Sequence, residues 1–285
     1  MALAKVGIVG SGIMAGGITE VAARAGHTVI VRARKQASAD DVVAGIATSL
    51  DKQVAKDRLT ADARDAILGR ISATDALADL ADCDLVIENV VEDLAVKKDL
   101  LAELGALVQP SAILATNTST LPVVELAVAS GRPDKVVGIH FFNPAPLMKL
   151  VEIVTPLTAS ADTVATATAF AQALGKDTVA VADRAGFVVN ALLFPYLNNA
   201  IRLWEQGTAS IADIDTAMQG GCGFPMGPFA LLDLVGLDTS LSILEALYAE
   251  FGDPNYAPVP TLRRKVAAGQ LGRKSGQGFL NYTGG

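Results

Sequence analysis

One histidine and one glutamate in this sequence have the residue types and the spacing for proton transfer. His140 ends an apolar run, Val136–His140, that is typical of a strand, and Glu152 lies in the next such run, Leu150–Val154. If the two strands lie side by side, the carboxylate can reach the imidazole, fix its tautomer and raise the basicity of the other ring nitrogen. The pair could then act as a general acid and base, although a His–Glu pair can also be purely structural. The other histidine, His27, stands in a turn before a strand, where we expect a surface role.

Two further polar positions are expected near the same place. Ser119 and Asn117 follow an apolar run, Ile113–Thr116, and residues beyond the carboxyl ends of strands line the ligand sites of open α/β sheets. Asn190 interrupts an apolar helical stretch, where a buried amide needs a hydrogen-bond partner. That partner is either a substrate carbonyl or the backbone of the protein itself.

A glycine pattern near the start of the chain indicates a dinucleotide site. Gly10 and Gly12 follow a predicted strand and precede a predicted helix, which is the context that this fingerprint requires. The backbone N–H groups at the helix start, around Ile13 and Met14, would hold the pyrophosphate. The alternative interpretation is an ordinary glycine-rich turn between a strand and a helix.

The end of the second predicted strand bears on which dinucleotide binds. Sites for NAD usually place an acid there, about 20 residues beyond the fingerprint, to bond the ribose 2′-hydroxyl. Here the chain has Arg32, Ala33 and Arg34, and the first acid is Asp40. Because arginine offers planar donors that suit a phosphate, we expect NADP(H) rather than NAD(H). The alternative is that both arginines stack on adenine or lie in solvent.

Regular elements must position these groups, and their pattern predicts a two-domain α/β protein. Seven strands are predicted at Lys5–Val9, Thr28–Val31, Leu85–Glu88, Ile113–Thr116, Val136–His140, Leu150–Val154 and Thr178–Ala182. Helices are predicted between most of them at 12–25, 38–57, 61–70, 94–108 and 160–173. This alternation predicts a doubly wound, mostly parallel sheet over residues 1–183.

From Phe187 onward the strand signal stops. The remaining predicted helices are Phe187–Glu205, Ile211–Met218, Phe229–Phe251 and Leu262–Ala268. We therefore expect an all-helical second domain over residues 184–285.

Composition excludes several classes of protein. Of the 285 residues 51% are hydrophobic and 19% charged, which suits a substantial buried core, and the net charge of −7 argues against nucleic acid or an anionic membrane as the partner. No apolar run reaches the roughly 18 residues of a membrane helix, and we read no signal peptide. The cysteines, Cys83 and Cys222, form neither a disulfide framework nor a metal-ligand spacing. We expect a cytoplasmic protein that binds no metal.

Seven blocks in order give the sequence a specific resemblance. They are the fingerprint at 10–17 and the stretches 88–97, 117–119, 140–146, 186–190, 225–229 and 272–279. Together they resemble the 3-hydroxyacyl-CoA dehydrogenases, most closely the short monofunctional 3-hydroxybutyryl-CoA dehydrogenases. The resemblance runs from about residue 4 to residue 282, and its His-Phe-Phe-Asn-Pro and Pro-Met-Gly-Pro blocks are more specific than the fingerprint.

The resemblance implies a reaction and roles for these residues. His140 would be the general base on a 3-hydroxyl while hydride passes between C3 and nicotinamide, and Glu152 would orient it. Ser119 would bond the reacting oxygen, and Asn190 would hold that oxygen or the thioester. The resemblance places the remaining polar residues around the cofactor: Glu92, Lys97, Asn117, Ser119, Asn143 and Lys274.

The acyl-CoA end of the substrate is predicted partly from spacing. Ser49, Lys52 and Lys56 stand at i, i+3 and i+7 of the helix predicted over 38–57, and hence on one face. In an acidic chain that face could receive the 3′-phosphate of CoA, and the family uses a serine and a lysine in the matching place; otherwise it is a solvated flank. By analogy with the family, we expect a homodimer formed through the helical domain.

Two rival hypotheses remain. One is a related dehydrogenase acting on another acyl-CoA or on a free 3-hydroxyacid; enzymes for free acids use a lysine base, which His140 with Glu152 speaks against. The other is a dinucleotide-binding protein that has lost activity. Retention of Ser119, His140, Glu152 and Asn190 together speaks against that.

Overall fold

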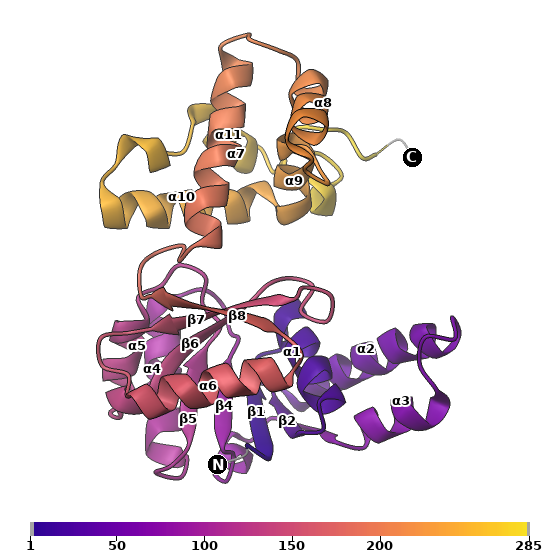
Figure 1. The fold of residues 1–285 in the computed structure, drawn as a ribbon, viewed down its shortest axis with the longest axis vertical. Coiled ribbons are helices and arrows are strands. Elements are labelled where there is room, and N and C mark those ends of the chain that lie inside the picture. The colour runs from indigo at the N-terminus through magenta and orange to yellow at the C-terminus, as the bar shows by residue number, and fades with distance from the viewer. Residues whose placement is uncertain (1–2, 284–285) are drawn as a thin grey trace. The chain divides into compact units, whose positions relative to one another are not determined.

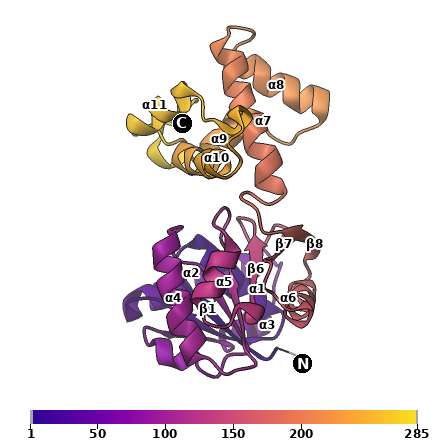
Figure 2. The ribbon, with the colours of Figure 1, turned by 90° about the vertical axis from the view of Figure 1, so that its left-hand side faces the viewer.

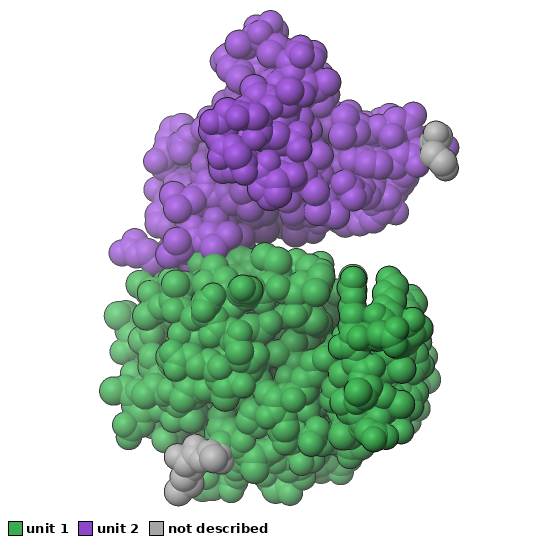
Figure 3. All heavy atoms as spheres, turned by 45° about the vertical axis from the view of Figure 1, so that its right-hand side comes forward, with its two compact units in different colours: residues 1–183 green, residues 184–285 purple. Residues whose placement is uncertain are grey.

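The computed structural model describes residues 3–283 of the chain. The chain divides into two compact units, with the boundary between Asp183 and Arg184 (Figure 3). The first unit is α/β and the second is helical (Figure 1).

The first unit is built on one sheet of eight strands. In sheet order they are β3 (Ile71–Thr74), β2 (Thr28–Arg32), β1 (Lys5–Val9), β4 (Leu85–Glu88), β5 (Ile113–Thr116), β6 (Val136–Phe141), β7 (Leu150–Thr155) and β8 (Asp177–Ala182). All neighbours are parallel except β6 and β7, which are antiparallel. The mostly parallel sheet that the sequence predicts is confirmed.

Helices cover both faces of this sheet, which explains why its central strands are apolar throughout. The helices are α1 (Ile13–Arg24), α2 (Gln36–Val54), α3 (Ala61–Leu68), α4 (Leu94–Leu107), α5 (Val123–Ala129) and α6 (Ala161–Ala173). Figure 2 shows α4 and α5 on one side of the sheet and α6 on the other. On the α6 side, α1, α2 and α6 contribute apolar side chains to one buried core with the strands.

Hydrogen-bonding side chains define where several of these helices begin. Thr60, Asp93 and Ser160 are the N-cap residues of α3, α4 and α6, and each accepts a hydrogen bond from the backbone N–H three residues later. Helix α1 has no such cap: its N-cap residue is Gly12, and no acid lies in its first turn. The first N–H groups of α1 are therefore not satisfied by a capping side chain.

The second unit contains five α-helices packed around their own core. They are α7 (Val189–Glu205), α8 (Ile211–Cys222), α9 (Pro228–Val235), α10 (Leu237–Phe251) and α11 (Pro260–Ala267). Short 3-10 turns occupy Leu77–Leu80 and Pro133–Lys135 in the first unit and Pro254–Tyr256 and Arg273–Ser275 in the second. Within residues 3–283, no helix has the length and apolarity needed to cross a bilayer.

Three predictions about elements were wrong in detail. Strand β3 was missed because Ile71–Thr74 is short and half polar, and α5 was missed because it spans only seven residues. The single helix predicted over Phe229–Phe251 is two helices. Gly236, at a φ of 103° that favours glycine, ends α9 and starts α10.

Candidate active site

The imidazole of His140 lies between a carboxylate and a hydroxyl. Strands β6 and β7 pair His140 directly opposite Glu152, and the imidazole Nδ1 lies 2.7 Å from Glu152 Oε2. On the other side of the ring, Nε2 lies 3.0 Å from Ser119 Oγ. Glu152 is fully buried and His140 is 4% exposed, so the pair is shielded from bulk water.

These contacts define which ring nitrogen can act as a base. An ionised carboxylate only accepts hydrogen bonds, so Nδ1 of His140 must carry the proton that Glu152 accepts. The neutral ring then presents its lone pair at Nε2, toward Ser119. This arrangement can take a proton from a hydroxyl that reaches Nε2, and Glu152 stabilises the imidazolium that results.

The loops around His140 are tied to the sheet edge. Asn117 Oδ1 accepts a hydrogen bond of 2.7 Å from the backbone N–H of Phe141, which joins the ends of β5 and β6. The ring of Phe142 packs on that of His140, with centroids 4.6 Å apart. Asn143 follows and is exposed. Asn117 thus holds the strand end that carries His140.

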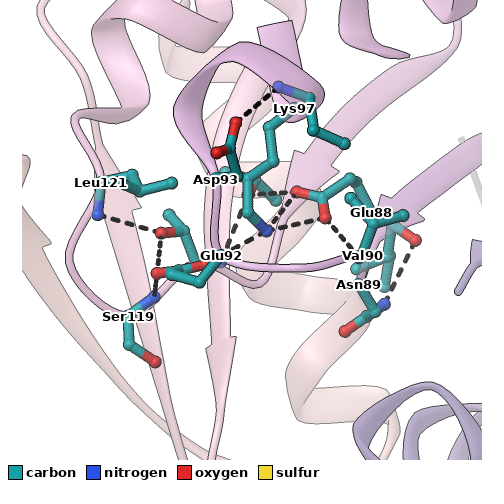
Figure 4. A network of polar contacts seen from close by, with 12 residues as sticks. Glu88, Asn89, Val90, Glu92, Asp93, Lys97, Ser119 and Leu121 are labelled. Carbon is teal, nitrogen blue, oxygen red and sulfur yellow. Dashed lines mark hydrogen bonds and ion pairs between the residues drawn. The ribbon is translucent and has the colours of Figure 1, made fainter. Parts of the chain in front are cut away.

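A buried ion pair between Lys97 and Glu88 lies beside the segment that carries Ser119 (Figure 4). The Lys97 ammonium donates to both oxygens of Glu88, at 2.7 and 2.9 Å, and lies 3.3 Å from Glu92 Oε2. Glu88 also accepts hydrogen bonds from Thr116 Oγ1 and the backbone N–H of Val90. Lys97 is 1% exposed and Glu88 is fully buried, so the charges are paired with each other rather than with solvent.

Glu92 connects this pair to Ser119. Its Oε1 accepts hydrogen bonds from the Thr118 hydroxyl at 2.6 Å, from the Ser119 N–H at 2.9 Å and from the Thr120 N–H at 3.2 Å. Burial alone would raise the pKa of Glu92, but the Lys97 charge and these hydrogen bonds outweigh it, and the pKa lies below its usual range. Glu92 is therefore ionised at neutral pH and holds the backbone of the 118–120 segment.

The glycine-rich turn has the geometry that a dinucleotide requires. Gly10 has a φ of 144°, and a Cβ there would lie 2.4 Å from the Asn89 carbonyl oxygen. A Cβ at Gly12 would meet no protein atom within 4 Å. The protein itself therefore does not require glycine at this position, whereas a phosphate approaching the uncapped start of α1 would.

The end of β2 presents two arginines and no acid. Arg32 is half-buried and its Nε donates to the Asp75 carbonyl oxygen at 3.1 Å. Arg34 is exposed and forms no hydrogen bond or ion pair with the rest of the described chain. Asp40, the first acid, accepts a hydrogen bond from Gln36 on α2. Arg34 is thus a cation available to a ligand at this strand end, and the exposed Lys35 follows it.

A groove of about 470 Å³ lies between α1, α2 and the loop after β6. Gly12, Gly16 and Gly17 line one wall, and Ser49 of α2 lies at its edge. Helix α2 ends at Val54, so the expectation that one helix carries Ser49, Lys52 and Lys56 is wrong for Lys56. That residue lies in the following turn, where its N–H still bonds the Gln53 carbonyl. Both lysines are exposed.

Two predicted site residues belong to the helical unit. Asn190 is 8% exposed, in the first turn of α7. The Lys274 ammonium pairs with the Asp238 carboxylate at 2.6 Å. Their places relative to His140 stay predictions.

Sequence reasoning gave no role to Glu88. The only signal was an acid at the end of a fully apolar strand, with a lysine nine residues later.

His27, expected at the surface, is half-buried: its Nδ1 lies 2.8 Å from the Leu3 carbonyl oxygen and its ring packs on Phe170. That histidine precedes β2 at the amino ends of the strands, away from His140.

Comparisons with known proteins define the class. Residues 5–184 match the family model of the 3-hydroxyacyl-CoA dehydrogenase NAD binding domain, and residues 186–282 match that of the C-terminal domain. The chain belongs to the 3-hydroxyacyl-CoA dehydrogenase family, and a nicotinamide dinucleotide is the cofactor that this family domain indicates.

Within this family, the chain is similar over its full length to proteins named 3-hydroxybutyryl-CoA dehydrogenase. The chain is 48% identical to a 3-hydroxybutyryl-CoA dehydrogenase of Mycobacterium tuberculosis, over 99% of both chains. It is 47% identical to a probable 3-hydroxybutyryl-CoA dehydrogenase of Deinococcus radiodurans, over 98% of this chain and 100% of the relative. The crystal structure of (S)-3-hydroxybutyryl-CoA dehydrogenase PaaH1 from Ralstonia eutropha matches with a TM-score of 0.96 and 40% identity, over 99% of this chain and 100% of that one.

The lowered pKa of Glu92 predicts how stability depends on pH. A carboxyl group whose pKa falls on folding stabilises the native state above its unfolded pKa, and this contribution is lost as pH falls through the folded value. The difference in free energy of unfolding between the wild type and Glu92→Gln should be constant from about pH 5.5 to 7.5 and shrink below the ordinary value of 4.5. Urea unfolding across this range measures it, and a difference that grows in acid would contradict the assignment.

Proposed function

We propose that this protein is an (S)-3-hydroxybutyryl-CoA dehydrogenase that interconverts 3-hydroxybutyryl-CoA and acetoacetyl-CoA with NADP(H). The observation that carries the proposal is the position of His140, with Glu152 on Nδ1 and Ser119 on Nε2. This arrangement orients one nitrogen for proton transfer beside a hydroxyl at the carboxyl edge of the sheet. The names of the full-length relatives supply the substrate class.

The residues of the chain account for the proton in this reaction. A bound nicotinamide would supply the hydride acceptor for C3 of the hydroxyacyl group, or the hydride donor in the reverse direction. In oxidation His140 Nε2 accepts the proton of the 3-hydroxyl, and Glu152 stabilises the charged ring; in reduction the same nitrogen gives the proton back. Ser119 bonds the reacting oxygen, Asn190 holds that oxygen or the thioester, and Asn143 supports the loop after His140.

The residues around Gly12 fit a dinucleotide. The uncapped start of α1, with the N–H groups of Ile13 and Met14, suits a pyrophosphate, and Gly12 leaves space for its approach. Glu92 is half-exposed and can face a ribose. Lys97 is enclosed by Glu88 and Glu92, which favours an action through Glu92 rather than on the cofactor directly.

The exposed guanidinium of Arg34, together with the absence of an acid at the end of β2, supports NADP(H) over NAD(H). A carboxylate at Ala33 would repel a 2′-phosphate, whereas arginine offers charge-assisted hydrogen bonds. Use of NADPH would favour the reductive direction, from acetoacetyl-CoA to 3-hydroxybutyryl-CoA.

The groove between α1 and α2 supports binding of CoA. Ser49 lies at its edge and the exposed Lys52 and Lys56 follow along the chain, so that the 3′-phosphate of CoA can reach cationic groups in an otherwise acidic protein. The helical unit exposes Leu192 by 73% and Leu234 by 50%, which supports a homodimer formed through that unit.

The structure weakens the free-acid alternative, which requires a lysine base. Lys97 lies near the site, but its ammonium is held by two carboxylates and is 1% exposed. An assay that follows nicotinamide absorbance with acetoacetyl-CoA separates this alternative, an inactive protein and the proposed enzyme.

Replacing His140 should stop proton transfer and leave the fold intact. We expect His140→Gln to lower kcat by about 10²–10⁴-fold, as is usual for the loss of an acid–base group. Nicotinamide absorbance with acetoacetyl-CoA measures turnover, and His27→Gln is the matched control that should keep it. Near-normal turnover of His140→Gln would refute the assigned base.

Cofactor choice gives a second test. We expect kcat/KM with NADPH to exceed that with NADH, and Arg34→Gln to reduce this ratio by about tenfold or more, the effect of losing a charge-assisted hydrogen bond. Arg58→Gln, a change to another exposed arginine, should affect both cofactors equally. A tenfold advantage of the wild type for NADH would end the NADP(H) proposal.

The CoA site gives a third test. Lys56→Glu should raise the KM for acetoacetyl-CoA much more than that for acetoacetyl-N-acetylcysteamine, because only the full substrate carries the 3′-phosphate. The control Lys135→Glu, at the amino edge of the sheet, should change neither KM. Equal increases for both substrates would count against the site.

A further inference from the structure

Lys176 is a buried cation that the proposed reaction does not use. It lies between α6 and β8 and is 9% exposed. Its ammonium donates to two backbone carbonyl oxygens, that of Ala145 at 2.6 Å and that of Met148 at 2.8 Å. No carboxylate of residues 3–283 forms an ion pair with it, and burial lowers its pKa. Such an uncompensated charge is costly, so its two hydrogen bonds must matter locally.

Both carbonyls belong to the loop of residues 142–149 that connects β6 to β7. Ala145 is 2% exposed, and the N–H groups of Leu147 and Met148 each donate to the Pro144 carbonyl at 3.0 Å. The loop therefore forms a compact turn, and Lys176 holds this turn at two points.

The opposite side of the loop packs against the dinucleotide helix. A Cβ at Gly17 of α1 would lie 3.1 Å from Ala145 Cβ and 3.2 Å from Pro146 Cδ. Residues Asn143–Pro146 also line the groove between α1 and α2. The loop is thus a wall of that groove and has two anchoring contacts, the ammonium of Lys176 and the close approach to Gly17.

We propose that Lys176 is a positioning residue for acyl-CoA binding: its ammonium holds the 142–149 loop in the place where Asn143–Pro146 form the groove wall. The substrate named here rests on the proposed function. The catalytic pair is held separately, by the β6–β7 ladder that joins His140 to Glu152 and by the hydrogen bond from Phe141 N–H to Asn117. Loss of the Lys176 ammonium should therefore affect binding more than the chemical step.

The experiment compares four variants of the full chain. Lys176→Met removes the donors and keeps the aliphatic stem, and Lys176→Gln keeps a shorter N–H donor. Gly17→Ala displaces the loop from the other side. Arg132→Met is the matched control, because Arg132 also donates to backbone carbonyls, those of Val108, Gln109, Pro110 and Ala112, but at the amino edge of the sheet.

Kinetics and hydrogen exchange test the proposal together. In Lys176→Met the KM for acetoacetyl-CoA should rise by about tenfold or more, with kcat within about threefold. The KM for acetoacetyl-N-acetylcysteamine should change little. Gly17→Ala should likewise raise the KM for acetoacetyl-CoA and not the KM for the truncated thioester, and Lys176→Gln should do so to a smaller extent. Arg132→Met should leave both KM values unchanged, although its free energy of unfolding in urea falls. The amides of Leu147 and Met148 should exchange faster in Lys176→Met and not in Arg132→Met.

Three outcomes would overturn this role. Unchanged amide exchange at Leu147 and Met148 in Lys176→Met would show that the ammonium does not hold the loop. Faster exchange with an unchanged KM would show that the loop is not part of the binding surface. If Lys176→Met lowered kcat only as much as Arg132→Met does and left KM unchanged, Lys176 would have only a general structural role. Failure of the wild type to turn over acetoacetyl-CoA would instead refute the proposed function, and the exchange measurement would still test the anchoring.

Discussion

The site depends on a single antiparallel step in an otherwise parallel sheet. Side chains alternate between the faces of a strand, so only one register of β6 against β7 places His140 opposite Glu152, and a slip of one residue would turn one of the two to the other face. Because β5 is parallel to β6, Ser119 emerges at the same edge as His140 and reaches the other ring nitrogen. The topology of three adjacent strands thus brings together a carboxylate, an imidazole and a hydroxyl.

Carboxylates near this edge serve two different purposes. Under the proposed function, Glu152 faces a ring that gains and loses a proton, and the carboxylate charge stabilises the protonated form. Glu88 and Glu92 instead share the ammonium of Lys97 and have no part in the proposed proton transfer. Glu92, which is paired with Lys97, thus holds the backbone of Ser119, and the proposed proton transfer is assigned to His140 alone.

Whether a feature could be predicted from the sequence depends on how far apart in the chain the interacting residues lie. Strands such as Ile113–Thr116 were recognised because their burial on both faces requires an apolar run, whereas the pairing of β6 with β7 was only a condition of the His140–Glu152 hypothesis until the structure showed it. The network of Glu88, Lys97 and Glu92 could not be foreseen, because it depends on how α4 packs behind β4. Lys176 was missed for the same reason, since its partners are backbone carbonyls about thirty residues away and no residue type marks them. The break at Gly236 is different: a single glycine in a helical pattern is compatible with continuation or termination, and its positive φ decides.

The groups proposed for proton transfer, Glu152, His140 and Ser119, all belong to the first unit and contact one another. Glu152 orients His140 through the contact with Nδ1, and Glu92 holds the backbone of Ser119. Preorganised donors and acceptors of this kind contribute most to catalysis because no reorganisation is required during the reaction. The proposed base is therefore formed within the first unit, whereas Asn190 and Lys274 belong to the helical unit. The loop between β6 and β7 then has two functions that the structure keeps apart: its strand ends define the catalytic pair, and its turn, anchored by Lys176, shapes the groove.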